Sequence, residues 1–229
     1  MQADMSSILP KRVPDNTNLK LYYEPVYRGV PVKVHNGPLI KEYLDKLYQT
    51  VVMSLRDHPR TFAFRVDLRI PYWMDAGYFP ELIERFQQSL RSKVYYDRLQ
   101  ARNRSKSGYA HQSRVRFVWA REIGQEGKPH FHVLILVNRD AYFRIGRLDS
   151  QEKNLSSLVE QAWASALGVP LDAVSGLVHF PPESEAYHLM SLDPDDSDFR
   201  RLMFWESYLC KYQTKHYGDR RRSFGYSRR

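Results

Sequence analysis

The sequence is poor in cysteine: Cys210 is the only one among 229 residues. A single thiol cannot form a disulfide within the chain, and it excludes the cysteine-rich clusters that hold structural zinc. A metal site in this chain must therefore be built from histidine and carboxylate side chains. A lone cysteine also fits a reducing compartment such as the cytoplasm.

Long apolar segments are lacking as well. No run approaches about eighteen consecutive apolar residues, and the first residues, MQADMSSILPKR, do not contain the apolar stretch of a signal peptide. We therefore expect neither a membrane span nor secretion, and we expect a soluble protein of the cytoplasm. The sequence also has no G-x-x-x-x-G-K-[ST] phosphate loop, which argues against an ATP-driven helicase within this chain.

Negative charge is in deficit. The chain has 26 Asp and Glu against 35 Lys and Arg, which gives a formal net charge of +9. Such an excess favours a polyanionic partner, because each lysine or arginine that contacts a phosphate releases a counterion. Charge alone leaves open the alternative of an ordinary basic soluble protein.

The spacing of apolar residues predicts an α+β domain. Helical and alternating periods predict helices over 38–56, 80–102, 150–167 and 198–216, and strands over 61–70, 114–122, 130–138 and 177–180. Without the first and last helices, the order is the split βαβ order of ferredoxin-like domains. It predicts an antiparallel sheet with a central His-x-His strand, helices on one face and a separate C-terminal helix. We expect an irregular arm over 1–36, one domain over 37–217 and a basic tail over 218–229.

Two histidines mark the third strand of this sheet. In KPHFHVLILVN, His130 and His132 are two residues apart and therefore point to the same face. If Glu122 lies opposite or nearly opposite His130 across the short GQEGK turn, its carboxylate completes a His-His-Glu cluster. Such a set leaves coordination positions open for water and phosphate, as in a catalytic metal site. The alternative for an isolated His-x-His is a structural pair of histidines.

A further carboxylate lies on the first central strand. Asp67 is on the face opposite to the large apolar residues of that strand. It can add a second carboxylate to the metal site or orient one of its histidines. The alternative is an ion pair with Arg65 or Arg69.

The last predicted helix contains WESYLCKYQTKHYG. At about 100° per residue, one face of this helix is phenolic and cationic, with Tyr208, Lys211, Tyr212 and Lys215. A phenol is a poor nucleophile at its usual pKa of about 10, but a metal that polarises a phosphate and a nearby ammonium make its attack feasible. The alternative is a core stripe made of Leu202, Trp205, Leu209 and Tyr212.

These segments together resemble the HUH endonucleases, a family named for its His-hydrophobe-His motif, and within it the inovirus-type replication proteins and the YagK/YfjJ C-terminal domains. The resemblance rests on FRVDLRIP, FVWAREIGQEGKPHFHVLILVNRDAY and SYLCKYQTK, within residues 40–216. It implies that His130 and His132 are metal ligands, that Glu122 is the third, and that the metal is Mg²⁺ or Mn²⁺.

The same resemblance implies that the YxxK pair of Tyr208 and Lys211 supplies the nucleophile and its helper. A second YxxK overlaps the first and makes Tyr212 the alternative nucleophile. We favour Tyr208, because its sequence surroundings fit the family's pattern better.

The implied activity is that of an endonuclease and ligase that nicks single-stranded DNA at a replication origin. A 5′-phosphotyrosine would form, and the freed 3′-hydroxyl would prime rolling-circle replication of a phage, prophage or mobile element in the cytoplasm of a bacterial host. The implied partners are origin DNA, a host helicase and a DNA polymerase, with no membrane. Two alternatives stay open: an HUH transposase or relaxase, and a non-catalytic protein that binds single-stranded nucleic acid.

Overall fold

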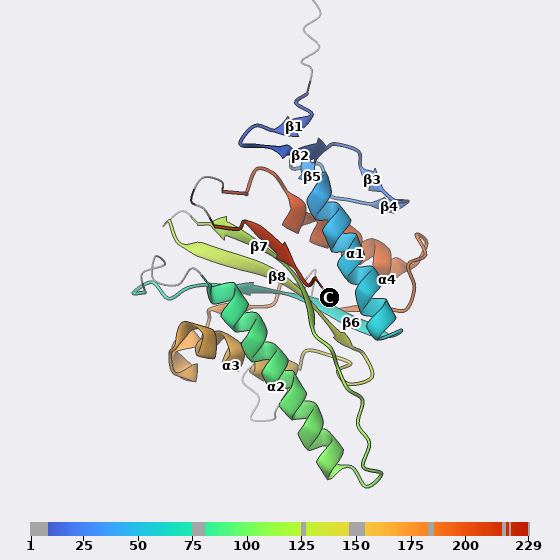
Figure 1. Cartoon of the computed structure of the whole chain (residues 1–229), viewed down its shortest axis with the longest axis vertical. Coiled ribbons are helices and arrows are strands. Elements are labelled where there is room, and N and C mark those ends of the chain that lie inside the picture. The colour runs from blue at the N-terminus through green and yellow to red at the C-terminus, as the bar shows by residue number, and fades with distance from the viewer. Residues whose placement is uncertain are drawn as a thin grey trace, which may run out of the picture.

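The computed structural model describes residues 9–74, 81–124, 127–146, 154–182, 186–216, 219 and 221–228. It is a mixed α+β structure in which helices cover both faces of a large antiparallel sheet, and smaller strands lie beyond one end (Figure 1). Every helix in the described part of the chain is too short or too polar to cross a membrane.

The large sheet contains the four strands that the sequence predicts. Its strands are β6 (Thr61–Leu68), β7 (Arg116–Ile123), β8 (Pro129–Asn138), β9 (Val178–His179), β10 (Tyr187–Leu189) and β11 (Phe224–Tyr226). Their order is β10-β6-β8-β7-β11, and β9 pairs with β6 next to β10. All these pairings are antiparallel. The His-x-His strand β8 thus lies in the centre, between β6 and β7.

Helices lie on both faces of this sheet, so the prediction of helices on one face is wrong. Helices α2 (Leu82–Arg104) and α3 (Leu155–Leu167) cover one face, and α1 (Lys41–Asp57) and α4 (Ser197–Glu206) cover the other (Figure 1). The physical reason is that the central strands are apolar on both sides: Val133 and Leu134 of β8 are both fully buried. A strand of this kind needs a helical layer on each face.

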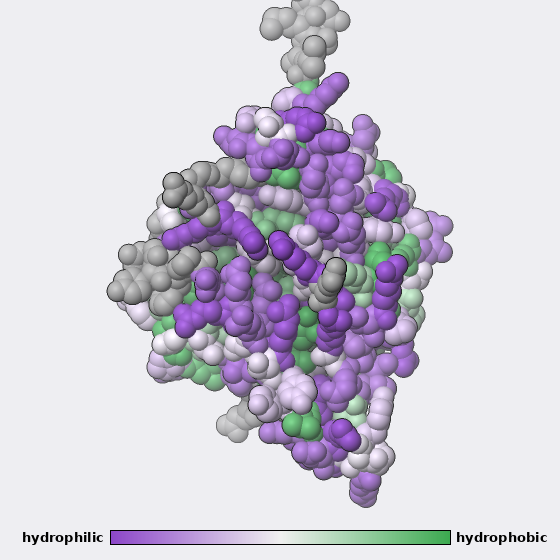
Figure 2. Space-filling model, in the orientation of Figure 1, coloured by the Kyte–Doolittle hydropathy of each residue, from purple (hydrophilic) through white to green (hydrophobic). Residues whose placement is uncertain are grey.

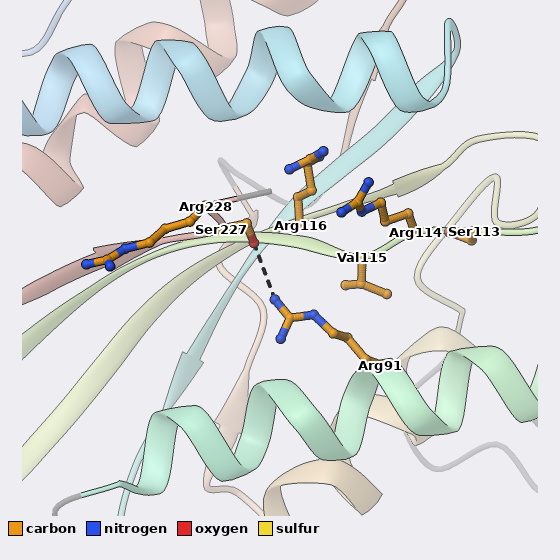
Figure 3. Close-up of a pocket in the computed structure, with 7 residues that line it drawn as sticks. All are labelled: Arg91, Ser113, Arg114, Val115, Arg116, Ser227 and Arg228. Carbon is orange, nitrogen blue, oxygen red and sulfur yellow. Dashed lines mark hydrogen bonds between the residues drawn. The ribbon is translucent and has the colours of Figure 1, made fainter.

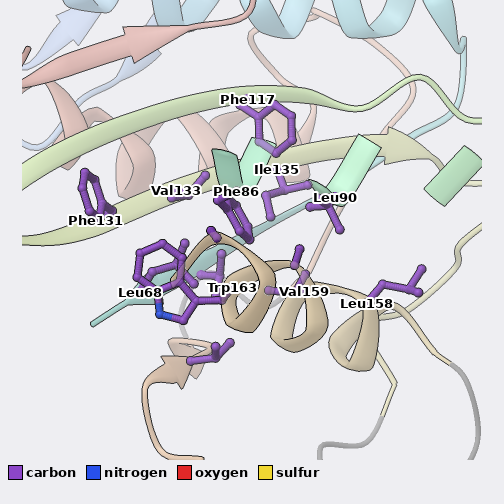
Figure 4. Close-up of a cluster of buried hydrophobic side chains, with 14 of the residues drawn as sticks. Leu68, Phe86, Leu90, Phe117, Phe131, Val133, Ile135, Leu158, Val159 and Trp163 are labelled. Atoms are coloured by element: carbon purple, nitrogen blue, oxygen red, sulfur yellow. The ribbon is translucent and has the colours of Figure 1, made fainter. Parts of the chain in front are cut away.

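The core beneath α2 and α3 contains the largest apolar side chains (Figure 4). Trp163 of α3 packs with edge-to-face geometry against Phe86 of α2 and Phe131 of β8, and its indole nitrogen donates to the carbonyl of Arg69 at 2.8 Å. Helix α3 begins at Asn154, whose side chain accepts from the amide of Ser157 in a capping box. Residues 150–153 of its predicted range lie outside the described part of the chain.

The described part of the predicted N-terminal arm is not irregular, and residues 1–8 lie outside the described part of the chain. Residues 9–40 form a three-stranded sheet of β1 (Arg12–Val13), β2 (Asn16–Tyr22) and β5 (Leu39–Ile40), together with a hairpin of β3 (Val26–Tyr27) and β4 (Val30–Pro31). These strands bury Val13, Leu21 and Ile40 together. Most are only two residues long, so they show too little alternation to be predicted from sequence.

The C-terminal helix is shorter than the predicted range of 198–216. Helix α4 ends at Glu206, and a short 3₁₀ helix, η4 (Ser207–Cys210), follows it. Lys211 then adopts an extended backbone and bridges to Leu39, and the amide of Tyr212 donates to the carbonyl of Pro38 at 3.1 Å. Contacts with the N-terminal sheet therefore replace the helix that the spacing predicts.

The predicted basic tail over 218–229 contributes a strand to the sheet. β11 pairs with β7 and places Gly225 opposite Trp119. A Cβ atom at Gly225 would overlap the Trp119 ring, so a glycine is required at this close approach. Residues 224–226 of the predicted tail are therefore part of the sheet, whereas residues 218, 220 and 229 lie outside the described part of the chain.

Candidate metal centre

The three central strands bring the predicted ligands together at one end of the sheet. In the register of the strands, Glu122 of β7 lies opposite His130 of β8, and Asp67 of β6 lies opposite His132. Because side chains alternate along a strand, all four point to the face covered by α1 and α4. The short connection between β7 and β8 fixes the pairing that the sequence predicts.

Glu122, His130 and His132 form a cluster that can hold a metal ion. Their candidate ligand atoms all lie within 4.8 Å of one another. Glu122 Oε2 is 3.2 Å from His132 Nε2 and 3.6 Å from His130 Nε2. The other oxygen, Oε1, is buried and accepts no hydrogen bond from the described residues. A buried carboxylate oxygen that accepts no hydrogen bond is costly unless cations compensate its charge, so the cluster fits a divalent metal.

Asp67 is not a member of this cluster but lies directly behind it. Its Oδ1 is 2.7 Å from His132 Nδ1, on the far side of the ring from Glu122. A hydrogen bond from Nδ1–H to this carboxylate leaves the lone pair of Nε2 free for a metal. Of the two roles predicted for Asp67, the structure favours orienting a histidine over coordinating the metal.

Arg65, which the sequence offers only as an alternative partner of Asp67, holds that carboxylate in place. Its guanidinium donates to both oxygens of Asp67, at 2.9 and 3.3 Å. Burial would lower the pKa of Arg65, but the charges of Glu206 and Asp67 outweigh this effect and raise it. The ion pair and the contact with His132 therefore coexist, and Arg65 stays charged beside the cluster.

The cluster favours the ionised carboxylate. Burial would raise the pKa of the Glu122 carboxyl, but hydrogen bonds to His130 and His132 outweigh it and hold the pKa well below its usual range. Burial likewise would lower the pKa of His132, but the bonds to Asp67 and Glu122 raise it. An ionised carboxylate is the form that a cation requires, whereas His132 must be neutral to coordinate one, so metal binding would release any proton that the raised pKa retains.

Tyr208 reaches the same centre from η4. Its hydroxyl donates to Glu122 Oε2 at 3.2 Å, and its ring lies edge-on to the His132 ring with centroids 5.6 Å apart. The Arg65 guanidinium carbon is 5.2 Å from the Tyr208 ring centroid. Burial and the negative charge of Glu122 raise the pKa of Tyr208 to about 12. The phenol therefore keeps its proton at neutral pH.

Two lysines lie near the centre in different ways. Lys211 Nζ is 5.7 Å from the centroid of the Tyr208 ring. Lys215 Nζ, in a fully buried side chain, is 3.9 Å from Glu122 Oε1, and burial lowers the pKa of Lys215 to about 8. The sequence places Lys215 in the second YxxK motif, on the predicted cationic face, but it does not predict the contact with Glu122.

Tyr212 is not part of the centre. It packs against the small cluster of Val13, Leu21 and Ile40 in the N-terminal sheet. Because the chain leaves helical geometry at Lys211, Tyr208 and Tyr212 do not share a helix face. The structure thus separates the two tyrosines that the sequence could not distinguish by spacing.

Comparisons with known proteins place the chain among uncharacterised relatives. It is 31% identical over 200 residues to the uncharacterized protein YfjJ of Escherichia coli K12, which covers 84% of this chain and 96% of YfjJ. It is 35% identical over 204 residues to the uncharacterized protein YagK of the same strain, over 84% of this chain and 95% of YagK. No solved structure matches it significantly. The model of the YagK/YfjJ C-terminal domain matches residues 23–227, and the chain therefore belongs to the YagK/YfjJ C-terminal domain family.

Proposed function

We propose that the protein is a metal-dependent DNA endonuclease and ligase of the HUH class, which initiates rolling-circle replication of a phage, prophage or mobile element. One observation carries the proposal: the Tyr208 hydroxyl donates to the same Glu122 oxygen that faces the Nε2 atoms of His130 and His132. A phenol at this position lies next to the cation that the three ligands would hold. This is the juxtaposition that attack on a phosphate requires.

The strand order supports a ferredoxin-like domain as the scaffold of this activity. In chain order the elements are β6, α2, β7, β8, α3 and then the pair β9 and β10. The first and third strands are neighbours in the centre of the sheet, and the last strands pair with the first. These features agree with a split βαβ arrangement, to which α1, α4 and β11 are added.

Glu122, His130 and His132 would hold a divalent cation, Mg²⁺ or Mn²⁺. Bound there, the cation would polarise the scissile phosphate as a Lewis acid. One carboxylate and two imidazoles leave coordination positions for phosphate and water, as in other catalytic metal sites with three protein ligands. Asp67 would keep His132 in the required tautomer through the contact at 2.7 Å.

In the proposed reaction, the Tyr208 oxygen attacks phosphorus and forms a 5′-phosphotyrosine. The bond from phosphorus to the 3′ oxygen breaks, and the phenol proton passes directly or through solvent to that oxygen, which leaves as a 3′-hydroxyl. Arg65 and Lys211, whose cationic groups lie 5.2 and 5.7 Å from the Tyr208 ring centroid, would stabilise the developing phenolate. Attack by a 3′-hydroxyl on the phosphotyrosine reverses these steps and rejoins a strand.

Exposed aromatic side chains beside the centre support single-stranded DNA as the substrate. Tyr72 and Trp73 follow β6 and are 85% and 58% exposed. Lys128, two residues before His130, donates to the carbonyls of Pro71 and Tyr72, which ties these aromatics to the same end of the sheet. Unpaired bases stack on exposed aromatic rings, and the net charge of +9 favours contacts with the phosphate backbone of DNA. The 3′-hydroxyl would then be extended by a host polymerase, with a host helicase opening the duplex.

The direct test is to mix the chain with origin-derived single-stranded DNA and Mn²⁺ or Mg²⁺ and to look for a covalent adduct on a denaturing gel. We expect an adduct that chelation abolishes, that Tyr208→Phe abolishes, and that Tyr212→Phe retains as the matched control. An adduct mapped to Tyr212 would overturn the assignment of the nucleophile. DNA binding without any adduct would overturn the enzymatic proposal and favour a binding protein.

A further inference from the structure

A hollow lined by arginines lies at the end of β7 that is opposite to the candidate metal centre. Here α2, the start of β7 and the segment after β11 enclose a hollow of about 500 Å³. Its described lining is Arg91, Ser113, Arg114, Val115, Arg116, Ser227 and Arg228. Figure 3 shows Arg91 extending from α2 toward the sheet and Arg116 extending from β7 toward α1. Four of the seven lining residues are arginines, and none is acidic.

The positive charge of this hollow is only partly compensated. Arg116 is buried and pairs with Asp57 at 2.6 Å, and Arg114 lies 3.5 Å from the same aspartate. The single negative charge of Asp57 therefore compensates two guanidinium groups. Arg91, Arg114 and Arg228 are exposed. Burial and the charges of Arg114 and Arg116 lower the pKa of Arg91, which shows that these cations are close enough to repel one another.

Contacts within the fold hold Arg91 in a defined position in this hollow. The hydroxyl of buried Ser227 accepts from the amide of Phe117 at 2.9 Å and from Arg91 at 3.5 Å. The Arg91 guanidinium also lies over the Phe117 ring, 4.9 Å from its centroid. Arg91 is thus positioned from two sides, and little side-chain entropy would be lost when it binds an anion.

A second hollow continues along β11 from the first. It has a volume of about 360 Å³, shares Arg228 with the first hollow and extends to Arg222. The carbonyl of Arg222 accepts from Arg121, the neighbour of Glu122 in the chain. The visible face around the end of β11 is mainly hydrophilic (Figure 2). Together the two hollows form a path toward the metal-centre end of the sheet, and its lining contains five arginines and one acidic residue, Glu84.

We propose that the four-arginine hollow binds backbone phosphates of DNA at a position remote from the metal centre. Planar guanidinium groups bind phosphate oxygens in pairs, and a path with several cations fits a chain of phosphates better than a single small anion. Arg116 and Glu122 are six residues apart on β7, or ~20 Å along the strand, so one phosphate cannot reach both sites. The proposal requires neither the metal nor Tyr208, and it stands whether or not the centre cleaves DNA.

The test compares two double variants that remove the same charge. Arg91→Gln with Arg114→Gln removes two exposed cations of the hollow and spares the buried Arg116. Arg104→Gln with Arg144→Gln removes two exposed arginines that do not line it. Binding to single-stranded DNA is measured by fluorescence anisotropy over a range of salt, with chelator present so that no strand is cut. Circular dichroism and thermal melts check that each variant folds.

For the hollow variant, two lost phosphate contacts should reduce the salt slope by about 1.4 and weaken binding roughly 25-fold at about 0.1 M salt. The control variant should retain the slope. An equal loss in both variants would show only the effect of net charge and would overturn the proposal, as would no loss in either. Should the hollow variant misfold, Arg228→Gln provides the same test with one contact and about half the change in slope.

Inorganic pyrophosphate distinguishes DNA from a small phosphate compound as the natural ligand. If the hollow serves DNA, pyrophosphate should compete only weakly at constant ionic strength. If pyrophosphate raises the melting temperature of the unchanged chain but not of the hollow variant, and DNA binding is the same in both, the ligand is a small phosphate compound and the assignment to DNA is wrong.

Discussion

The contact between Asp67 and His132 predicts how tightly the candidate centre would hold a metal ion. Asp67 Oδ1 lies 2.7 Å from His132 Nδ1, and the two side chains are only 17% and 9% exposed. Asp67→Asn keeps the size of the side chain but removes the charge that fixes the tautomer. Carboxylates behind a metal ligand contribute about 10- to 100-fold in affinity, or about 1.4 to 2.8 kcal/mol. Because solvent screens this buried pair poorly, we expect a loss near the upper end.

Isothermal titration with Mn²⁺ measures this affinity directly. The matched control is Asp140→Asn, because Asp140 pairs with Arg60 at 2.9 Å, is 26% exposed and follows the opposite end of β8. Thermal melts without metal separate a loss of affinity from a loss of stability. If Asp67→Asn binds Mn²⁺ within about twofold of the unchanged chain, or if both variants weaken equally, Asp67 does not orient a metal ligand.

Three further outcomes follow from the described geometry. Trp73→Ala should weaken binding to single-stranded DNA by about 1 to 3 kcal/mol in anisotropy assays, whereas Tyr109→Ala, which removes a ring that is 63% exposed, should not. Burial raises the pKa of the Cys210 thiol, so alkylation should be far slower in the native chain than in urea; equal rates would contradict its burial. Burial and the hydrogen bond to Asp45 raise the pKa of Tyr27 from 10.0 to about 12. The protonated phenol therefore stabilises the fold fully below pH 10, and this stabilisation is lost as the pH rises to about 12. In urea unfolding, the free energy of unfolding of Tyr27→Phe should therefore fall less between pH 10 and about 12 than that of the unchanged chain.

The sequence is sufficient to predict the candidate ligand cluster because strand geometry is local. Alternation placed His130 and His132 on one face, and the short turn set Glu122 opposite His130, as the register shows. The same alternation placed Asp67 on that face. Its role behind His132 needed the pairing of β6 with β8, which joins segments about sixty residues apart in the chain and leaves no local signal.

The C-terminal segment was predicted less well because tertiary contacts overrode local spacing. The apolar and cationic residues after Tyr208 continue a helical pattern, yet Lys211 bridges to Leu39 and Tyr212 binds Pro38. β11 is three residues long and lies in an arginine-rich segment, so neither length nor alternation identified it. The order of the central strands, by contrast, followed from the order of elements along the chain.

The placement of Tyr208 beyond β8 has a consequence for synthesis. As the chain leaves the ribosome, β6, β7 and β8 emerge with Asp67, Glu122 and both histidines before η4 and β11 exist. A nascent chain therefore contains every residue of the candidate cluster before it contains the tyrosine, and only the later segments add the phenol and Lys215. In the order of translation, the candidate metal ligands therefore precede the phenol that the proposed reaction requires.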